Sequence, residues 1–439
     1  MLKRGSPIHD SSFKALQNLK VDYVRFVPWY PYPHAAVPEL RPPTKDSTFW
    51  DFSQIDPIVE DFMNATEGHS VIMNFSTIPV WMFRTDKPVE VPSDPDSVFW
   101  AYNKGTELRD TTLKELTDYF VRLFSWYTKG GFTDELGHYH KSGYHYKFQY
   151  WEVLNEPDLE HHISPQLYTR IYDAVVPALK KISPETKFVG LALALENTPE
   201  WFEYFLNHKN HKPGVPLDGI SYHFYARPSP QDKPIEGWQY SFFEQADNFL
   251  VKVRYIENIR KRLSPHTFTD LDELGVILGD QTGKNITDPA YWNLAGAMYA
   301  YLYVELAKMG IEVAGESQLV GYPSQFPSVS MMNWTNGKPN ARYWILKLLK
   351  DNFGPGDKLV ATNSNASEVT AQAFITPEGN KLLLVNKRSK PITLELPDNV
   401  KEYQVQYVDV STGDGPPGKK KLINNSVTLN PFSVTIVQF

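Results

Sequence analysis

Cysteine is absent from the 439 residues of this chain. The absence excludes disulfide bonds, thiolate metal sites and a cysteine nucleophile. The formal net charge is −7, so we do not expect nucleic acid as a partner. The sequence also lacks a glycine-rich phosphate loop and the Gly-x-Ser-x-Gly elbow of serine hydrolases. No apolar run is long enough to span a bilayer, and no signal peptide opens the chain.

Aromatic residues, in contrast, are plentiful. They make up 14% of the chain, with 11 Trp and 25 Tyr. This excess is compatible with stacking platforms for sugars, although most rings are expected to pack in the core. The length suits a barrel of about 250–350 residues with a smaller module attached. A hydrophobic fraction of 41% is enough for a sizeable core.

Asn-x-Ser/Thr sequons occur at Asn64, Asn74, Asn285, Asn333, Asn365 and Asn424. Several of them lie in segments with the composition of surface loops, and Asn74 lies on a predicted strand. The sequons favour a secreted or lysosome-like protein, whose leader would then have been removed from this chain.

Strand-like and helical patterns alternate through the first 345 residues. The predicted strands are Tyr23–Pro28, Val71–Phe75, Phe148–Leu154, Lys187–Leu193, Gly219–Tyr225, Thr267–Leu271 and Ile311–Leu319. The predicted helices between them are Ile55–Met63, Thr111–Thr128, Pro165–Ile182, Pro199–Leu206, Ala246–Arg262 and Tyr291–Met309. This α/β alternation predicts a parallel sheet wound right-handed, closed into a (β/α)8 TIM barrel. Only Met1–Pro7 is available for a strand before the predicted helix Ser11–Leu19, so we expect a short or truncated first strand.

The chain changes character after one more predicted helix, Ala341–Asp351. Short alternating strands follow, separated by turn signals such as Pro377-Glu378-Gly379. These strands are Val369–Ile375, Lys381–Val385, Ile392–Leu396, Tyr403–Tyr407 and Ser426–Phe439. We therefore predict the barrel over residues 1–350 and an antiparallel β-sandwich over residues 351–439.

The most informative stretch is the predicted strand Phe148–Leu154 and the Asn155-Glu156-Pro157 that follows it. Proline cannot continue a ladder, so Glu156 is predicted where the strand becomes a loop. The acid/base of a glycosidase needs a carboxylate at the carboxyl end of a barrel strand, beside an amide that can hold a substrate hydroxyl. The alternative interpretation is a solvated glutamate in a strand-ending turn.

A second carboxylate, Glu273, follows the seventh strand, and Gly275 is expected to let the backbone turn away there. With the short first strand counted, Glu156 ends the fourth strand, which faces the seventh across such a barrel. The two carboxylates could then lie about 5 Å apart, the separation found in retaining glycosidases. Asp270 and Asp272 are rivals for the nucleophile, but side chains alternate along a strand, so Asp272 points away from the face of Glu273.

Several of these features resemble the clan A retaining glycoside hydrolases. The resemblance is carried by Phe148–Asp158, by the pair Asp272-Glu273 and by the 117 residues that separate Glu156 from Glu273 (273 − 156). Family 39, which holds β-xylosidases and α-L-iduronidases, is the most similar, over about Phe13–Leu349. The resemblance implies that Glu156 is the acid/base, that Glu273 is the nucleophile and that Asn155 contacts the sugar 2-hydroxyl.

The same resemblance extends to Tyr23-Val24-Arg25, Trp50-Asp51-Phe52 and Ser221-Tyr222-His223. The chain departs from the family in its nearly absent first strand. It also departs at Ala314–Gln318 in the eighth strand, where aromatic residues are usual. The Asp272-Glu273 pair is more similar to iduronidases than to xylosidases.

Residues on neighbouring strands could support the two glutamates. Arg25 could hold Glu273 ionised through a charge-assisted hydrogen bond, or it could form a structural ion pair. His223 and Tyr225 share one face of their strand. The tyrosine could donate to the nucleophile and the histidine could contact the sugar; a pair buried in the core is the alternative.

Other residues are candidate contacts for the sugar. Trp29, Tyr30, Trp81 and Trp334 lie on predicted strand-to-helix loops, where each could stack on a sugar face or simply pack at the rim. Glu316 could hydrogen-bond a polar substituent of the sugar, as could Gln318, or Glu316 could pair with Arg25 or another cation.

Histidines gather at His138, His140 and His145 and again at His161 and His162. No carboxylate or cysteine follows them at ligand spacing, so we predict no metal site. We expect no cofactor either.

Together these features predict a retaining glycoside hydrolase that works by double displacement, with exo action on β-xylosides or related glycosides. Its partner would be a carbohydrate: an oligosaccharide, a polysaccharide or a glycoconjugate. An endo-acting glycanase of the same clan is an alternative, and an open groove lined with aromatic residues would favour it. A transglycosylase would share the same residues. A non-catalytic carbohydrate-binding barrel is the alternative from another class.

Overall fold

The computed structural model describes residues 3–28, 31–99, 105–194, 198–279, 288–321, 326–396 and 402–439. The chain divides into two compact units. The first unit consists of Asp22–His223 and Arg254–Asp272, and the second of Met1–Val21, Phe224–Val253 and Glu273–Phe439. Both units combine segments that are distant in the sequence. The division between residues 350 and 351 stays a prediction.

Seven strands of the described chain form one sheet, and their order in the sheet follows the sequence. They are β1 (Tyr23–Phe26), β2 (Ser70–Met73), β5 (Tyr150–Glu152), β6 (Lys187–Leu193), β7 (Gly219–Ala226), β8 (Phe268–Val276) and β9 (Val313–Glu316). The pairs from β1 to β7 are parallel, and parallel neighbours require a crossover, usually a helix. Both β7 and β8 run from the first unit into the second.

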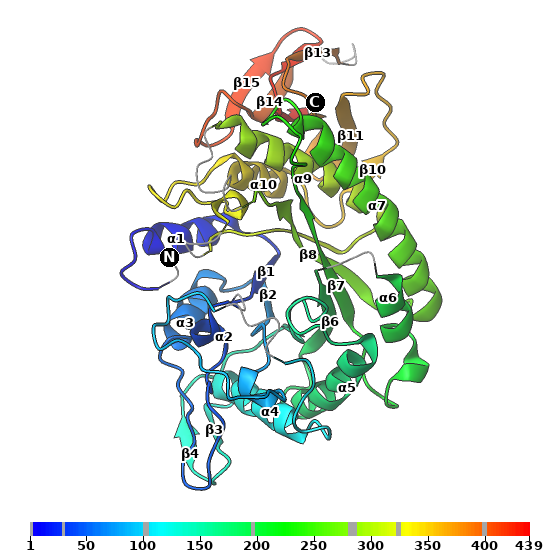
Figure 1. Ribbon diagram of the computed structural model, residues 1–439. Coiled ribbons are helices and arrows are strands. Elements are labelled where there is room, and N and C mark those ends of the chain that lie inside the picture. Colours follow the sequence, from blue (N-terminus) through cyan, green and yellow to red (C-terminus); the bar gives the residue numbers. More distant parts are fainter. Residues whose placement is uncertain are drawn as a thin grey trace. The chain divides into compact units, whose positions relative to one another are not determined.

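Helices occur between the strands, as the alternating pattern predicts. They are α3 (Asp56–Ala65), α4 (Lys114–Thr128), α5 (Pro165–Ile182), α6 (Pro199–Phe205), α7 (Trp238–Leu263) and α9 (Ala290–Met309). At the start of α5, Ser164 accepts a hydrogen bond from the Leu167 amide and Pro165 occupies the first turn. Buried side chains recur along α5 at Tyr168, Ile171, Tyr172, Val175 and Leu179. This stripe is the face that a helix on a sheet must bury, and α5 also contacts α4 (Figure 1).

The described residues before α1 (His9–Leu19) form turns, and none of them forms a strand. In the second unit α1 packs against α10 (Ala341–Asn352): the Tyr343 hydroxyl donates to the Ala15 carbonyl at 2.9 Å. The first unit also holds a short helix and a hairpin: α2 (Pro33–Ala36), and β3 (Gly131–Thr133) paired with β4 (Tyr139–Lys141).

β8 is longer than the predicted strand, and this changes the setting of Glu273. The sequence predicts an end at Leu271, but β8 continues to Val276, so Glu273 lies within the strand. The expected turn at Gly275 is wrong. A Cβ atom at Gly275 would lie 3.2 Å from the Tyr225 ring and 3.4 Å from the Ser317 carbonyl. The glycine therefore permits close packing between strands, not a change of direction.

Antiparallel strands follow in the second unit. A six-stranded sheet has the order β10 (Lys358–Val360), β11 (Val369–Thr376), β12 (Gly379–Asn386), β17 (Val434–Gln438), β14 (Tyr403–Val408) and β15 (Gly418–Leu422). β13 (Ile392–Glu395) pairs with β16 (Ser426–Leu429). Leu384, Val405 and Val437 lie in the core of this region, and α9 and α10 contact the larger sheet (Figure 1).

The sequence predicts one strand over Ser426–Phe439, whereas β16 and β17 are separate strands joined by a turn that includes Phe432 at φ 52°. β10 and β15 occupy segments for which no strand is predicted. Among the described residues, no helix is long and apolar enough to cross a membrane.

Candidate active site

Glu156 follows β5 on a backbone held from two sides. The Asn155 amide donates to the Ser76 carbonyl, and the Glu156 amide donates to the Ala192 carbonyl, each at 2.9 Å. Leu154 and Glu156 both have positive φ values, 65° and 43°. Such conformations cost about 1–3 kcal/mol each for a residue with a Cβ atom and persist where surrounding contacts impose them. Backbone strain is therefore present on both sides of Asn155.

The side chain of Glu156 meets the imidazole of His223, a residue of β7. Glu156 Oε1 is 2.8 Å from His223 Nδ1. On the other side of the ring, Nε2 is 3.4 Å from Asp272 Oδ1. The imidazole and Asp272 are almost fully buried, whereas 13% of the Glu156 side chain is exposed. Only the glutamate of this trio thus retains solvent exposure above a few per cent.

A cluster of carboxyl groups surrounds Arg25 of β1. Arg25 Nη2 lies 2.6 Å from Glu152 Oε2, and Nε lies 2.8 Å from Asp272 Oδ2. Asp270 is also fully buried in β8. In addition, Glu152 accepts hydrogen bonds from Asn74 at 2.7 Å and from a serine of β7 at 2.5 Å. One guanidinium therefore faces several buried carboxyl groups.

Burial and mutual repulsion distribute the charge in this cluster unequally. Burial raises the pKa of Asp270 well above its usual range, and the nearby Glu152 adds to the effect. Burial likewise raises the pKa of Asp272, against the opposing effect of Arg25. Burial alone would also raise the pKa of Glu152, but Arg25 and the hydrogen bonds from Asn74 and β7 lower it. We conclude that Glu152 carries the negative charge that balances Arg25.

Asn155 is fixed at both ends of its amide. Its Oδ1 accepts from Arg25 Nη2 at 2.7 Å, and its Nδ2 donates to Glu160 Oε1 at 3.1 Å. Both Asn155 and Glu160 are buried. The predicted contact between Asn155 and a sugar hydroxyl stays a prediction, as does a contact between Arg25 and Glu273.

Glu273, in the second unit, has hydroxyl groups as neighbours. The Tyr225 hydroxyl donates to Glu273 Oε2 at 2.6 Å, and it lies 2.5 Å from the Ser317 hydroxyl. Tyr225 thus donates to Glu273, whose role as nucleophile stays a prediction, and Ser317 is a neighbour that the sequence does not predict. A hydrogen bond to a carboxylate favours its ionised form.

Glu316 is the partner of a cation, as one of the two sequence interpretations allows. Arg342 Nε lies 2.8 Å from Glu316 Oε1, and both side chains are almost fully buried. Burial raises the pKa of Glu316 to about 7, and Arg342 limits the rise. Gln318 is half-buried, and its backbone is hydrogen-bonded to Val329 at 3.2 Å and to Met331 at 2.9 Å.

The candidate stacking residues differ in their surroundings. Trp29 and Tyr30 lie outside the described residues. Trp81 donates its indole N–H to the Glu39 carbonyl at 2.7 Å, and the Arg109 guanidinium lies 4.5 Å from the centre of its ring. Trp334 is half-buried, and its buried indole N–H has no hydrogen-bond partner within the described parts of the chain.

The histidines of the two predicted clusters contact carboxylate and hydroxyl groups. His140 Nε2 lies 2.9 Å from Asp134 Oδ2, and His138 Nδ1 lies 3.7 Å from the same oxygen. His161 lies 2.9 Å from the Thr77 hydroxyl, and burial lowers its pKa to about 3. His161 is therefore a neutral core residue. Asn74 is fully buried, so its sequon is not exposed in the folded chain.

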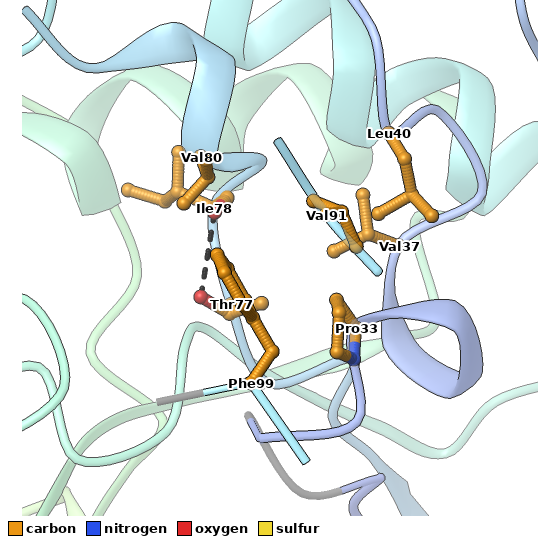
Figure 2. Close-up of a pocket in the computed structure, with 8 residues that line it drawn as sticks. All are labelled: Pro33, Val37, Leu40, Thr77, Ile78, Val80, Val91 and Phe99. Atoms are coloured by element: carbon orange, nitrogen blue, oxygen red, sulfur yellow. Dashed lines mark hydrogen bonds between the residues drawn. The ribbon is translucent and has the colours of Figure 1, made fainter. Parts of the chain in front are cut away.

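A small pocket opens in the first unit beside the segments that follow β1 and β2 (Figure 2). It is lined by Pro33, Val37, Leu40, Thr77, Ile78, Val80, Val91 and Phe99. The Thr77 hydroxyl faces the Ile78 carbonyl at 3.4 Å. The lining has no charged side chain, so this pocket offers apolar contact and no acid–base chemistry.

Comparisons with known proteins agree with this picture. Residues 137–271 match the model of Glycosyl hydrolases family 39. No curated protein sequence matches the chain.

Solved structures of glycosidases are similar along the whole chain. A monomeric β-xylosidase from Caulobacter crescentus CB15 aligns with a TM-score of 0.60 and 15% identity, covering 98% of this chain and 92% of that one. A family 51 arabinofuranosidase from Xanthomonas axonopodis pv. citri aligns with a TM-score of 0.64 and 12% identity, covering 99% of this chain and 92% of that one. A family 30 endoxylanase from Clostridium papyrosolvens C71 aligns with a TM-score of 0.57 and 15% identity, covering 99% of this chain and 93% of that one.

At these identities the likeness concerns the fold. It confirms the predicted class, an α/β TIM barrel followed by an antiparallel β-domain. The similarity of residues 137–271 to Glycosyl hydrolases family 39, taken with this shared fold, supports a glycoside hydrolase.

Proposed function

We propose that the chain is a retaining, exo-acting glycosidase for β-xylosides or related glycosides, with Glu273 as nucleophile and Glu156 as acid/base. The observation that carries the proposal is a pair of side chains on β7, each of which makes a hydrogen bond to one of the two glutamates. His223 Nδ1 meets Glu156 at 2.8 Å, and the Tyr225 hydroxyl meets Glu273 at 2.6 Å. Residues two apart on a strand share a face. Two glutamates with such different partners suit two different roles.

The chemistry proceeds in two displacements. In the first, the Glu273 carboxylate attacks the anomeric carbon, the glycosidic C–O bond breaks, and Glu156 gives its proton to the departing oxygen. In the second, the Glu156 carboxylate takes a proton from water while the water oxygen attacks the anomeric carbon and Glu273 departs. Glu156 ends protonated, as it began, but with a proton taken from water, so each cycle consumes one water.

The surroundings of the rival aspartates support Glu273 as the nucleophile. A nucleophilic carboxylate must be ionised and must reach the sugar. Asp270 is fully buried, the Asp272 side chain is 2% exposed, and burial raises the pKa of both. Both aspartates are therefore poor candidates, whereas Glu273 is half-buried and has a hydroxyl donor.

The substrate class is proposed by analogy. The similar structures are a β-xylosidase, an arabinofuranosidase and an endoxylanase. We propose Asn155 as the contact for the sugar 2-hydroxyl, with Trp334 and Gln318 as further contacts. Arg25 would orient Asn155 through their 2.7 Å hydrogen bond.

A panel of nitrophenyl glycosides tests the proposal. It should include the β-xyloside, β-glucoside, β-galactoside, α-L-arabinoside and α-L-iduronide. We expect hydrolysis of the β-xyloside or a related glycoside, and NMR should show that the first sugar released keeps its anomeric configuration. Inversion would contradict the nucleophile assignment. If no nitrophenyl glycoside is hydrolysed but a polysaccharide is digested, the endo-acting alternative is favoured.

A further inference from the structure

His223 stands between Glu156 and a carboxyl group for which the proposed reaction has no use. Its Nδ1 is 2.8 Å from Glu156 Oε1, and its Nε2 is 3.4 Å from Asp272 Oδ1. All three residues belong to the first unit. The ring therefore connects the proposed acid/base to Asp272.

We propose that Asp272 is a positioning residue that acts on Glu156 through His223. Asp272 stays protonated and donates its O–H to His223 Nε2, which fixes the neutral imidazole as the tautomer with hydrogen on Nδ1. That Nδ1–H donates to Glu156 Oε1. Glu156 Oε2 is then the oxygen that carries the exchangeable proton in both displacements. The inference rests on the role proposed for Glu156.

The contacts of Asp272 supply the first argument. Its Oδ2 lies 2.8 Å from Arg25 Nε, but the Nε–H donates to Glu152 Oε2 at 2.6 Å. Neither carboxyl oxygen of this buried side chain accepts a hydrogen bond within the described parts of the chain, so Oδ1, on the side of His223, can carry a proton. The Oδ1–Nε2 distance of 3.4 Å is long for a hydrogen bond, and catalytic hydrogen bonds often tighten when the substrate binds.

The charges around Asp272 supply the second argument. The groups that face it are Arg25 on β1, Glu152 on β5, His223 on β7 and Asp270 on β8. The single guanidinium is already matched by Glu152 at 2.6 Å. A second buried negative charge would have no counterpart, and burial raises the pKa of Asp272 accordingly. A neutral carboxyl at Asp272 leaves the cluster electrically balanced.

The tautomer matters because Glu156 has two oxygens. With hydrogen on Nε2, the Nδ1 lone pair would draw the proton of Glu156 to Oε1, toward the histidine and away from a glycosidic oxygen. With hydrogen on Nδ1, Oε1 can only accept, in the acid form as well as in the carboxylate form. The same imidazole then suits both displacements without changing its protonation.

Kinetics on two aryl xylosides test the proposal. Phenyl β-xyloside needs a proton on its leaving oxygen and 2,4-dinitrophenyl β-xyloside does not. Asp272→Ala should lower kcat/KM on the phenyl substrate by about 10²-fold, at the lower end of what general acids contribute, with a change of only a few-fold on the other. Asp272→Asn should restore most of the loss because its N–H replaces the O–H toward Nε2. The matched control is Asp270→Ala, two residues earlier on β8. This variant should leave the ratio of kcat/KM on the two substrates unchanged.

Two kinetic results would overturn the proposal. If Asp272→Asn is as impaired as Asp272→Ala, Asp272 acts as an ionised acceptor. If the ratio of kcat/KM on the two substrates is the same for Asp272→Ala as for the wild type, Asp272 does not act on Glu156. Separate results would contradict the proposed function. In one, Glu156→Gln lowers kcat/KM by the same factor on both substrates; in the other, the wild type hydrolyses neither substrate.

Nitrogen NMR of the histidine-labelled protein reads the tautomer without any substrate. The His223 signals are assigned from their loss in His223→Gln. We expect hydrogen on Nδ1 in the wild type and in Asp272→Asn, and a mixture of tautomers in Asp272→Ala. Hydrogen on Nε2 in the wild type would overturn the proposal, whatever the outcome of the kinetics.

Discussion

Glu156 and Glu273 differ in what lies around them. Glu156 meets a buried imidazole, behind which Asp272, Arg25 and Glu152 form a cluster with several carboxyl groups. Glu273 meets the hydroxyl of Tyr225, which itself lies 2.5 Å from a serine hydroxyl. The first setting is rich in groups that gain and lose protons, and the second offers hydroxyls that titrate far above neutral pH.

The difference shows how one residue type can be prepared for two tasks. A group that must give and take a proton benefits from a neighbour whose hydrogen bonding is fixed. A group that must stay ionised benefits from donors that keep their hydrogen. The predictions below test this contrast.

The largest effect is expected from Glu273→Ala. Without a nucleophile, kcat should fall by at least about 10⁴-fold, as for other members of catalytic units. Azide should restore part of the activity and yield a glycosyl azide of inverted configuration, which NMR identifies. An unchanged melting temperature is the control for folding. Activity near that of the wild type would remove Glu273 from the nucleophile role.

Glu156→Gln should show an effect that depends on the leaving group. Loss of the general acid should lower kcat/KM by about 10²- to 10⁴-fold on phenyl glycosides. Dinitrophenyl glycosides should keep most of their kcat/KM because their leaving groups need no proton. A uniform loss on both substrates would mean that Glu156 has a binding role, and the contrast with Glu273 would disappear.

Tyr225→Phe should have an intermediate effect. A hydrogen bond to a charged group contributes about 1.5–3 kcal/mol, so kcat/KM should fall by about 10- to 100-fold. The acidic limb of the kcat/KM profile should move to higher pH, because the hydroxyl no longer favours ionised Glu273. Tyr222→Phe, on the opposite face of the same strand, is the matched control. An unmoved acidic limb would contradict this role of Tyr225.

The smallest effect concerns a buried carboxyl group that lies outside both settings. Burial, with a contribution from Glu135, raises the pKa of Glu39 to about 8. The unfolded chain has the ordinary lower pKa, so the folded state holds the extra proton and the free energy of unfolding falls as pH rises toward 8. Glu39→Gln should raise that free energy by roughly 1–2 kcal/mol at pH 9 and leave it unchanged at about pH 4.5. Denaturant titrations at the two pH values measure the difference, and an equal effect at both would contradict the prediction.

The sequence predicts the elements that local pattern determines. The predicted strand Lys187–Leu193 and helix Pro165–Ile182 agree with β6 and α5 at every residue. β5 ends at Glu152, so the proline after Glu156 correctly places Glu156 in a loop but not the residue at which the strand ends. The period of two places His223 and Tyr225 on one face of β7, where each meets a glutamate.

What the sequence does not predict depends on partners that are distant along the chain. The sequence predicts a turn at Gly275. Instead, a residue without a side chain is required there by the ring of Tyr225, which lies 50 positions earlier in the chain (275 − 225). The role of Asp272 depends on its distances to Arg25 and His223, which no local pattern contains. Trp81 is of a residue type that stacks on sugars, but the Arg109 guanidinium lies over its ring.

The strand order of the C-terminal sheet has a consequence for synthesis. β17 lies between β12 and β14, and it leaves the ribosome after both of them. Until β17 emerges, each of these neighbours has an edge whose backbone groups are unpaired, and such edges are prone to pair with other chains. β17 therefore closes the sheet, and slow or incomplete translation of Val434–Gln438 would leave both of these edges exposed at once.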